Sequence, residues 1–564
     1  MKKLLLTCCL IAVTIAKAQV EPQLNWAKGM GGTESDISTA ITIGTSNVYT
    51  TGHFRGTADF DPGTGKVNLT AAGENDIFIS KLNAITGNIV WARSIGGNSY
   101  DAGTSVAVDA SGNVYITGLF NNTVDFDPGA GTYNLTADSI EDAFIAKLDA
   151  SGNFVWAKKI GAKGLDGGSS ISLDLAGNLY VLGNFNGKVD FDPGVNTFNL
   201  TSAGDDIFVT KFNVSGNFKW AKSFGGNDYD VGQSIKADAS GNLYLTGYFN
   251  ETVDFDPGTA TFNLTSAGYS DIFISRLDSV GKFVWAKRIG ANSNDYGNSI
   301  SLDLDGNVYT TGSFNGSPDF DPGNGVFQLS SSGSADIFIS KLDASGNFVW
   351  AKKIGGTGYD AAYSLYVSKS GYVFFTGIFT GTADFDPGTG IMNLVASNSF
   401  GSAFIAKLDT AGNFGPAFNT WAAAGIGGSS IIVDAVNYVY ATGGFSGTND
   451  FDPSSGIFNL TSAGASDISV AAIKQVASSG IEEFIGDKVT IYPNPTHGII
   501  NLELGMRNES NLQIQVLNSL GQVVMEETQI QHSQFNIQHL PDGLYFVKVM
   551  SKNTIIASQK IIKN

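Results

Sequence analysis

Short runs of β-branched and aromatic residues alternate with turns rich in Gly, Asn, Asp and Ser along most of the chain. In one representative segment this pattern predicts four strands, called A to D here, over Ser105–Asp109, Val114–Phe120, Asp142–Asp149 and Phe154–Ile160. Between residues 19 and 476 no stretch places apolar residues at the 3.6-residue period of a helix between capping signals. We therefore expect hairpins throughout this region.

The four-strand pattern recurs at a fixed interval. The tetrapeptide Asp-Phe-Asp-Pro occurs seven times in steps of 64 to 66 residues, and the seven tryptophans follow the same interval. The tetrapeptides begin at Asp59, Asp125, Asp190, Asp254, Asp319, Asp384 and Asp450. Repeats of this kind bury the apolar faces of each unit against its neighbours. Four strands per unit are typical of a propeller blade.

The order of the strands predicts how the ring closes. The chain begins with a lone D strand around Trp26, and the seventh unit ends in a C strand with no tryptophan strand after it. The N-terminal strand can therefore complete the last blade and remove an open sheet edge. We expect an all-β fold with a seven-bladed β-propeller of four-stranded blades over residues 19–476. The segment between strands B and C should form an added hairpin on the outer or lateral edge of each blade.

The two ends of the chain differ from the repeats. Residues 1–18 combine a basic start, an apolar run and Ala16-Lys17-Ala18, which predicts a secretory signal peptide. The apolar run is shorter than the ~20 residues of a membrane-spanning helix. A polar linker over 477–487 then separates the repeats from alternating strands over 488–564. These strands predict a separate, small β-sandwich.

Composition limits the possible partners. The only cysteines, Cys8 and Cys9, lie in the predicted signal peptide, so we expect no disulfide in the mature chain. Removal of three signal-peptide lysines from 33 Lys and Arg leaves 30 against 52 Asp and Glu, a net charge of −22. A surface this acidic repels phosphate backbones and anionic lipid heads. We expect no nucleic-acid partner, no membrane insertion and a monomer.

The repeat motifs resemble a known family. The runs Trp-Ala-Lys-Lys-Ile-Gly, Asp-x-x-Gly-Asn-x-Tyr-x-x-Gly and Asp-Ile-Phe-Ile-x-Lys-Leu-Asp resemble the bacterial β-propeller repeat family of secreted and surface proteins. The resemblance extends over about four-fifths of the chain. It implies a fold and an extracellular setting but no shared activity.

The C-terminal segment resembles the sorting domain of type IX secretion cargo in Bacteroidota. The residues placed as in that family's motif are Tyr492, Pro493, Asn494, Pro495, Gly498, Gly521, Gly543 and Tyr545. The resemblance implies a small β-sandwich that engages the type IX secretion machinery, directs export across the outer membrane and is then usually cleaved. We therefore expect a secreted or outer-surface protein that follows Sec export and type IX translocation.

The Asp-x-Asp pairs are candidates for a metal site. In an extended segment both carboxylates of a pair, such as Asp59 and Asp61 or Asp125 and Asp127, point to one side, which would suit calcium. Calcium takes roughly six to eight oxygens, however, and the segment lacks the third acidic residue and the terminal Glu of a calcium loop. We favour a buried Phe, a solvated acidic face and a Pro-Gly turn, with calcium as the alternative and no other cofactor.

A second acidic position recurs about ten residues after the tryptophan. It is occupied by Asp36, Asp101, Asp166, Asp230, Asp295 and Asp360, and the seventh unit lacks it. A carboxylate in this loop can accept backbone N–H bonds and connect adjacent blades. We interpret this position as a structural cap.

Function should lie where the units differ, because a catalytic centre needs unlike groups at one point. A Ser-His-Asp triad in the propeller would need His53, which occupies a freely varying position, so we expect no catalytic residue and no enzyme. The candidate ligand residues are His53, Arg55, Lys236 and Tyr366. We expect a binding or surface-interaction module toward glycans or proteins. The alternatives are a polysaccharide hydrolase or lyase with two converging carboxylates, and a calcium-stabilised structural or adhesin repeat.

Overall fold

The computed structural model describes residues 20–138, 140–415, 418–421, 428–454, 456–477, 489–492, 495–504, 512–518, 522–528, 534–551 and 554–564. The regular elements in these residues are all β-strands, which confirms the predicted all-β class. None of the described residues belongs to a helix that could cross a membrane. The described residues divide into two compact units, one within residues 22–475 and the other within residues 476–564.

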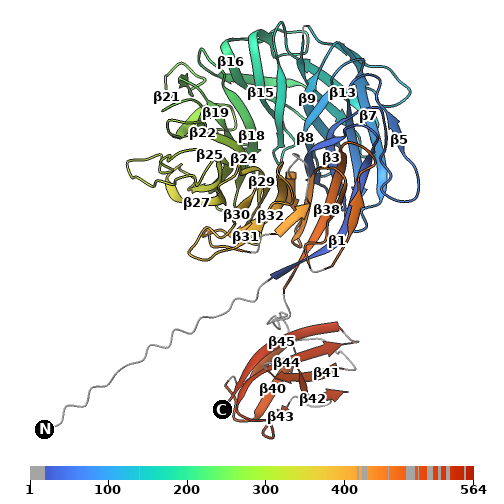
Figure 1. The fold of residues 1–564 in the computed structure, drawn as a ribbon, viewed down its shortest axis with the longest axis vertical. Coiled ribbons are helices and arrows are strands. Elements are labelled where there is room, and N and C mark those ends of the chain that lie inside the picture. The colour runs from blue at the N-terminus through green and yellow to red at the C-terminus, as the bar shows by residue number, and fades with distance from the viewer. Residues whose placement is uncertain are drawn as a thin grey trace, which may run out of the picture. The chain divides into compact units, whose positions relative to one another are not determined.

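The larger unit contains seven antiparallel blade sheets, arranged around a ring in Figure 1. Each has four blade strands, A to D, and in three of the sheets a B-to-C hairpin adds two more strands. The blade strands of the first sheet are β2 (Ile37–Ile43), β3 (Asn47–Phe54), β6 (Asp76–Asn83) and β7 (Ile89–Gly97). Those of the second are β8 (Ala102–Val108), β9 (Val114–Phe120), β12 (Asp142–Leu148) and β13 (Phe154–Ile160). Those of the third are β14 (Gly167–Leu173), β15 (Leu179–Asp190), β16 (Asn199–Phe212) and β17 (Phe218–Phe224). The blade strands of the fourth sheet are β18 (Val231–Ala237), β19 (Leu243–Phe249), β22 (Asp271–Leu277) and β23 (Phe283–Ile289). Those of the fifth are β24 (Tyr296–Leu302), β25 (Val308–Phe314), β26 (Asp336–Leu342) and β27 (Phe348–Gly356). Those of the sixth are β28 (Ala361–Val367), β29 (Tyr372–Phe379), β32 (Ser402–Asp409) and β33 (Phe418–Trp421).

The seventh sheet joins the two ends of this unit. Its strands are β34 (Gly428–Val433), β35 (Tyr438–Phe445), β38 (Asp467–Ala477) and, from the N-terminus, β1 (Val20–Gly32). Blue β1 lies beside orange β38 in Figure 1. The innermost strands contact each other in the closed order β2, β8, β14, β18, β24, β28, β34 and back to β2. The predicted β-propeller is confirmed, and β1 occupies the place predicted for the closing strand.

The segment between strands B and C links neighbouring blades. It forms short hairpins, which are β4 (Thr57–Asp59) with β5 (Asn68–Thr70), β10 (Thr123–Asp125) with β11 (Asn134–Thr136), β20 (Thr252–Asp254) with β21 (Asn263–Thr265), β30 (Thr382–Asp384) with β31 (Asn393–Val395), and β36 (Thr448–Asp450) with β37 (Asn459–Thr461). Asp59 pairs with Gly31 on β1, and Asp125 pairs with Gly96 on β7. The hairpin of β30 pairs with β27 in the same way. At these three places the added hairpin extends the D strand of the preceding blade, which the predicted edge position did not specify.

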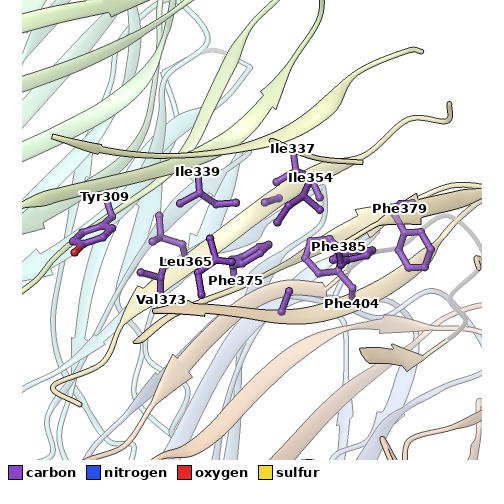
Figure 2. Close-up of a cluster of buried hydrophobic side chains, with 14 of the residues drawn as sticks. Tyr309, Ile337, Ile339, Ile354, Leu365, Val373, Phe375, Phe379, Phe385 and Phe404 are labelled. Carbon is purple, nitrogen blue, oxygen red and sulfur yellow. The ribbon is translucent and has the colours of Figure 1, made fainter. Parts of the chain in front are cut away.

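The core lies between successive blades. Figure 2 shows one such cluster, in which Ile337 and Ile339 of β26 face Leu365 and Phe375 of β28 and β29. Phe385, from an Asp-Phe-Asp-Pro segment, is fully buried in the same cluster. Its ring lies 5.3 Å from Phe379 and 4.9 Å from Phe404. Full burial of a side chain this large stabilises the fold by about 1.5–3 kcal/mol, so the repeated Phe contributes to every blade contact.

The smaller unit consists of two sheets. One contains β39 (Val489–Tyr492), β40 (Ile499–Leu504) and β43 (Gln534–Asn536), and the other contains β42 (Val523–Thr528), β41 (Leu512–Asn518), β44 (Gly543–Ser551) and β45 (Thr554–Lys563). Ile500 and Phe535 from the first sheet share one buried cluster with Val516, Val547 and Ile561 from the second. Two sheets that enclose a common core form the predicted β-sandwich.

Candidate functional site

The Asp-x-Asp carboxylates act as acceptors within a turn. Oδ1 of Asp59 accepts the backbone N–H groups of Asp61 (3.0 Å) and Val67 (2.9 Å), and Oδ1 of Asp61 accepts that of Gly63 (2.8 Å). Asp125 and Asp127 make the same bonds in the second unit. Among the described residues no group of three or more His, Cys, Asp or Glu could hold a metal ion. The contacts therefore support the turn interpretation, and calcium binding stays an untested alternative.

The aspartates of the D-to-A loops connect adjacent blades. Asp101 accepts the N–H of Gly97 (2.8 Å) on the preceding D strand and the N–H of Asn121 (2.9 Å) after its own B strand. Its own N–H donates to the carbonyl of Asn75 (2.9 Å) in the preceding blade. The carboxylate is fully buried. This geometry is that of a structural cap, as the sequence indicated.

Two of the four candidate ligand residues lie at the end of the propeller formed by the D-to-A loops. His53 pairs with Ile37, the first residue of β2, and its ring lies 5.5 Å from Tyr100. Burial lowers the pKa of His53, so the ring is neutral at physiological pH. Arg55 is exposed at the same end, and its backbone N–H donates to Asp36.

The other two candidates lie near the opposite end, on inner strands. Lys236 and Tyr366 are the sixth residues of β18 and β28. His53 pairs with the first residue of an inner strand, so the two positions lie about 17 Å apart along the strand direction. Ser172, at the equivalent position of β14, accepts the N–H of Ala237 on the next inner strand (3.0 Å), so this position faces the central channel. Lys236 is exposed there, and the surrounding ring of strands desolvates its ammonium group and lowers its pKa.

Tyr366 borders a pocket at that opposite end. The pocket has a volume of about 710 Å³ and lies between the sixth, seventh and first blades. Its lining includes Ile43, Lys369, Val436 and Tyr438. Because the pocket and His53 lie at opposite ends of the strands, the structure does not bring the four candidates into one site.

A different group of side chains gathers at the D-to-A end of blades four to six. It comprises Tyr229, Tyr248, Tyr296, Tyr359 and Tyr363, called the tyrosine cluster here. The ring centroids of Tyr248 and Tyr296 lie 4.8 Å apart, and those of Tyr229 and Tyr248 lie 6.3 Å apart. Tyr229, Tyr359 and Tyr363 are 48%, 43% and 37% exposed, so the cluster presents aromatic faces to solvent.

Burial keeps the hydroxyl groups of Tyr248, Tyr296 and Tyr363 protonated, because it raises their pKa. Burial raises the pKa of Tyr248, whose hydroxyl also interacts with Tyr229 and Gln233. Burial likewise raises the pKa of Tyr363, whose hydroxyl interacts with Tyr359. The cluster therefore combines aromatic rings with neutral hydroxyl and amide groups, which can both donate and accept hydrogen bonds.

Sequence reasoning missed this cluster because its members occupy different positions of the repeat. Tyr229 and Tyr359 precede the capping aspartates, Tyr248 is on a B strand, and Tyr296 and Tyr363 are the first and third residues of A strands. The residue before the capping aspartate is Tyr in three units, at Tyr100, Tyr229 and Tyr359. Tyr248, Tyr296 and Tyr363 are each the single Tyr at their position of the repeat, and only the order of the blades places the five members together. The available signal was the density of tyrosines between residues 229 and 363 near the D-to-A turns.

The residues of the sorting motif hold turns of the smaller unit. Gly498 has φ +114°, and a Cβ there would lie 2.3 Å from Cγ of Gln538. The buried Tyr545 donates its hydroxyl hydrogen to the carbonyl of Pro541 (2.7 Å). Tyr492 and Pro495 are exposed, and Gly543 begins β44. Pro493, Asn494 and Gly521 lie outside the described residues.

Comparison with known families identifies both parts of the chain. The family described as "Beta-propeller repeat" matches residues 90–122 and 284–318, each of which extends from a D strand through the next A and B strands. The family described as "Secretion system C-terminal sorting domain" matches residues 490–564. The chain combines β-propeller repeats with a type IX sorting domain. Both predicted resemblances are confirmed, and the sorting domain indicates export to the cell surface or the extracellular space.

Individual relatives of this propeller protein are distant. "Uncharacterized WD repeat-containing protein L264" of Acanthamoeba polyphaga mimivirus is 27% identical over 48% of this chain and 23% of its own length. "Regulatory protein FlaEY" of Caulobacter vibrioides is 23% identical over 61% of this chain and 37% of its own length. The chain thus spans well under half of either relative.

Solved structures show similarly remote likenesses. A europium-containing methanol dehydrogenase is 12% identical over 80% of this chain and 93% of that chain, with a TM-score of 0.37. Sqt1 from Chaetomium thermophilum is 10% identical over 81% of this chain and 100% of that chain, with a TM-score of 0.32. Likenesses this weak say nothing about activity.

Proposed function

We propose that this exported propeller is a non-catalytic module that binds glycans through the tyrosine cluster. The observation that carries the proposal is the gathering of five tyrosines at one end of three adjacent blades, with three of them 37–48% exposed. Aromatic side chains with a polar tip suit surfaces that are apolar on one side and wet on the other. The C–H faces of sugar rings can stack on the tyrosines while the neutral hydroxyl and amide groups bind sugar hydroxyls.

The export of the protein supports this ligand class. The sorting domain takes the chain to the cell surface or beyond, where polysaccharides and glycoproteins are abundant. The members of the cluster are themselves uncharged, so the site suits a neutral sugar better than a phosphate or a lipid headgroup.

The proposal includes no catalysis. Nδ1 of His53 is buried without a hydrogen-bond partner among the described residues, so no carboxylate orients the ring as in a hydrolase triad. The Asp-x-Asp carboxylates recur in each blade and are bonded to backbone N–H groups. Separate acid and base roles need two carboxyl groups in unlike environments.

A glycan screen with the mature chain tests the proposal. We expect binding to a subset of neutral glycans, and Tyr229→Ala or Tyr359→Ala should weaken it roughly tenfold, as expected when a contact worth more than 1 kcal/mol is lost at an interface. Tyr269→Ala is the matched control, because Tyr269 is 72% exposed and lies outside the cluster. This control should change affinity less than about twofold.

Three results would contradict the proposal. Glycan binding that is equally strong in the Tyr229→Ala and control variants would place the site elsewhere, with the Tyr366 pocket as the next candidate. Turnover of the bound polysaccharide would show an enzyme. Binding of a protein in place of any glycan, lost in the same variants, would keep the tyrosine cluster as the site but change the ligand class.

A further inference from the structure

Six junctions between blades bury a pair of aspartates. Each pair consists of the first residue of a C strand, or its equivalent in β16, and the capping aspartate of the next blade. The pairs are Asp76 with Asp101, Asp142 with Asp166, Asp206 with Asp230, Asp271 with Asp295, Asp336 with Asp360, and Asp467 with Asp36, and each member is at most 6% exposed. Two carboxyl groups so close in a desolvated place cannot both stay ionised without a compensating positive charge.

In two of the pairs both side chains face one glycine, which is Gly31 for Asp467 with Asp36 and Gly355 for Asp336 with Asp360. A Cβ on Gly31 would lie 2.7 Å from Oδ1 of Asp467 and 2.9 Å from Oδ2 of Asp36. Both oxygens of Asp36 accept backbone N–H groups, at 2.7 Å from Gly32 and 3.0 Å from Arg55. Oδ2 of Asp467 accepts the N–H of Ala463 at 2.9 Å.

In five of the six pairs one oxygen has no hydrogen-bond partner. It is Oδ1 of the C-strand aspartate, and this atom is buried without a hydrogen bond in Asp76, Asp142, Asp271, Asp336 and Asp467. In Asp206 the same oxygen accepts the N–H of Gly204 at the long distance of 3.4 Å. Three of the four oxygens are thus occupied by N–H groups, which leaves too few for calcium, since calcium takes roughly six to eight oxygen ligands. A proton needs only the one free oxygen.

The seventh junction lacks both members. Ser402 replaces the C-strand aspartate, and its Oγ accepts the N–H of Ser397 (2.9 Å). The facing loop has no aspartate between Trp421 and Ser429. The two residues are therefore present together or absent together, as expected if each requires the other.

The six pairs fall into two kinds according to the neighbouring D strand. At three junctions a basic side chain contacts the C-strand aspartate: Lys159 with Asp142 (3.2 Å), Arg288 with Asp271 (2.6 Å) and Lys353 with Asp336 (3.3 Å). The same position at the other three junctions carries Ser94, Ser223 and Gly29. Beyond the pairs themselves, the charged groups that influence these three are Glu34, Asp205 and Asp228, which are all acidic.

We propose that the three pairs without a basic neighbour, Asp76/Asp101, Asp206/Asp230 and Asp467/Asp36, each hold one proton from solvent, and that its release at higher pH loosens these blade junctions. The protonated carboxyl is neutral, so the pair carries a single negative charge that the backbone N–H groups stabilise. Loss of the proton leaves two buried anions, and their repulsion acts directly on the contact between blades.

The raised pKa values of these aspartates determine how the stability of the protein changes with pH. Burial raises the pKa of Asp101 and Asp230 to about 7, and that of Asp206 and Asp467 to about 6. The folded protein therefore holds more protons than the unfolded chain above the ordinary aspartate pKa of 3.8, and stability falls as the pH rises through about 6 to 7. Burial also raises the pKa of Asp295 to about 7, but Arg288 balances one of the two charges at that junction.

Thermal unfolding of the mature chain at pH 5.5 and pH 8 tests the proposal. The wild-type melting temperature should fall between these pH values. The triple variant Asp76→Asn, Asp206→Asn, Asp467→Asn replaces the protonated acid with a neutral amide of the same shape. It should melt close to wild type at pH 5.5 and about 3 °C or more above wild type at pH 8.

The matched control is Asp142→Asn, Asp271→Asn, Asp336→Asn. These changes leave Lys159, Arg288 and Lys353 without their buried partner, so the control should melt lower at both pH values and keep the wild-type pH dependence. If a triple variant does not fold, the single variants Asp76→Asn and Asp142→Asn give the same comparison. The infrared carbonyl band of a protonated carboxyl should also be present at pH 5.5 in wild type and reduced in Asp76→Asn.

Two outcomes would overturn the proposal. One is a fall in melting temperature from pH 5.5 to pH 8 that is the same in wild type and in the first triple variant. The other is a rise in wild-type melting temperature at pH 8 on addition of calcium that the variant lacks, which would show that a metal ion occupies the pairs.

Discussion

At the scale of single residues, the repeated side chains serve the fold. The Phe of each Asp-Phe-Asp-Pro segment is buried, and the flanking carboxylates close its turn. The sequence predicted that the Phe is buried and that both carboxylates point the other way, because side chains alternate along an extended segment. It could not show that the capping aspartates face a second aspartate in the preceding blade, since that contact joins different units.

The division of roles predicts unequal effects of mutation within one segment. Phe126 is fully buried, with ring centroids 5.3 Å from Phe120 and 5.1 Å from Phe144. Phe126→Ala should lower the free energy of unfolding by about 3–5 kcal/mol, because it leaves a cavity. Asp127→Ala removes one bond to the N–H of Gly129 (2.8 Å) and should cost about 1 kcal/mol or less. Urea denaturation measures both, and equal losses would contradict the assigned roles.

At the scale of elements, strands exchanged between blades hold the ring closed. Three of the B-to-C hairpins, those that contain β4, β10 and β30, pair with the D strand of the preceding blade, and β1 completes the seventh sheet. Trp26 on β1 donates its indole N–H to the carbonyl of Ala84 in the first blade (3.0 Å). The closing strand therefore contacts two blades.

Removal of the closing strand should open the propeller. A chain that begins at residue 33 lacks β1 and leaves the edge of β38 unpaired. We expect aggregation and a lower melting temperature, because an exposed edge strand pairs with other chains. Light scattering and thermal unfolding compare it with a chain that begins at residue 19, which should stay soluble. Addition of a synthetic peptide of residues 20–32 should restore stability; a truncated chain that is as stable as the control would refute the closure role of β1.

At the scale of the whole molecule, the chain joins a β-propeller to a sorting domain. The two compact units have separate cores, and the sorting-domain family matches residues 490–564. The motif residues Gly498 and Tyr545 hold turns of this unit, so they act through its fold.

The sorting unit should therefore work on another cargo. In a bacterium with type IX secretion, a folded reporter with a signal peptide and residues 477–564 should reach the medium or the cell surface. The same reporter with Gly498→Val should be retained, because that side chain would collide with Gln538. The exposed neighbour His497→Ala is the control and should be exported normally. Cell fractionation and immunoblotting measure the outcome, and equal export of all three would argue against the sorting role.

The sequence by itself determined the all-β class, the propeller repeats, the closing strand and the sorting domain, because a repeat period and a local strand pattern are properties of consecutive residues. Tertiary structure decided which residues meet. The four candidates His53, Arg55, Lys236 and Tyr366 separate because strand position places them at opposite ends of the propeller. The tyrosine cluster and the buried aspartate pairs form because the ring brings different repeat positions of neighbouring blades into contact, and a repeat period shows which positions recur but not which of them meet.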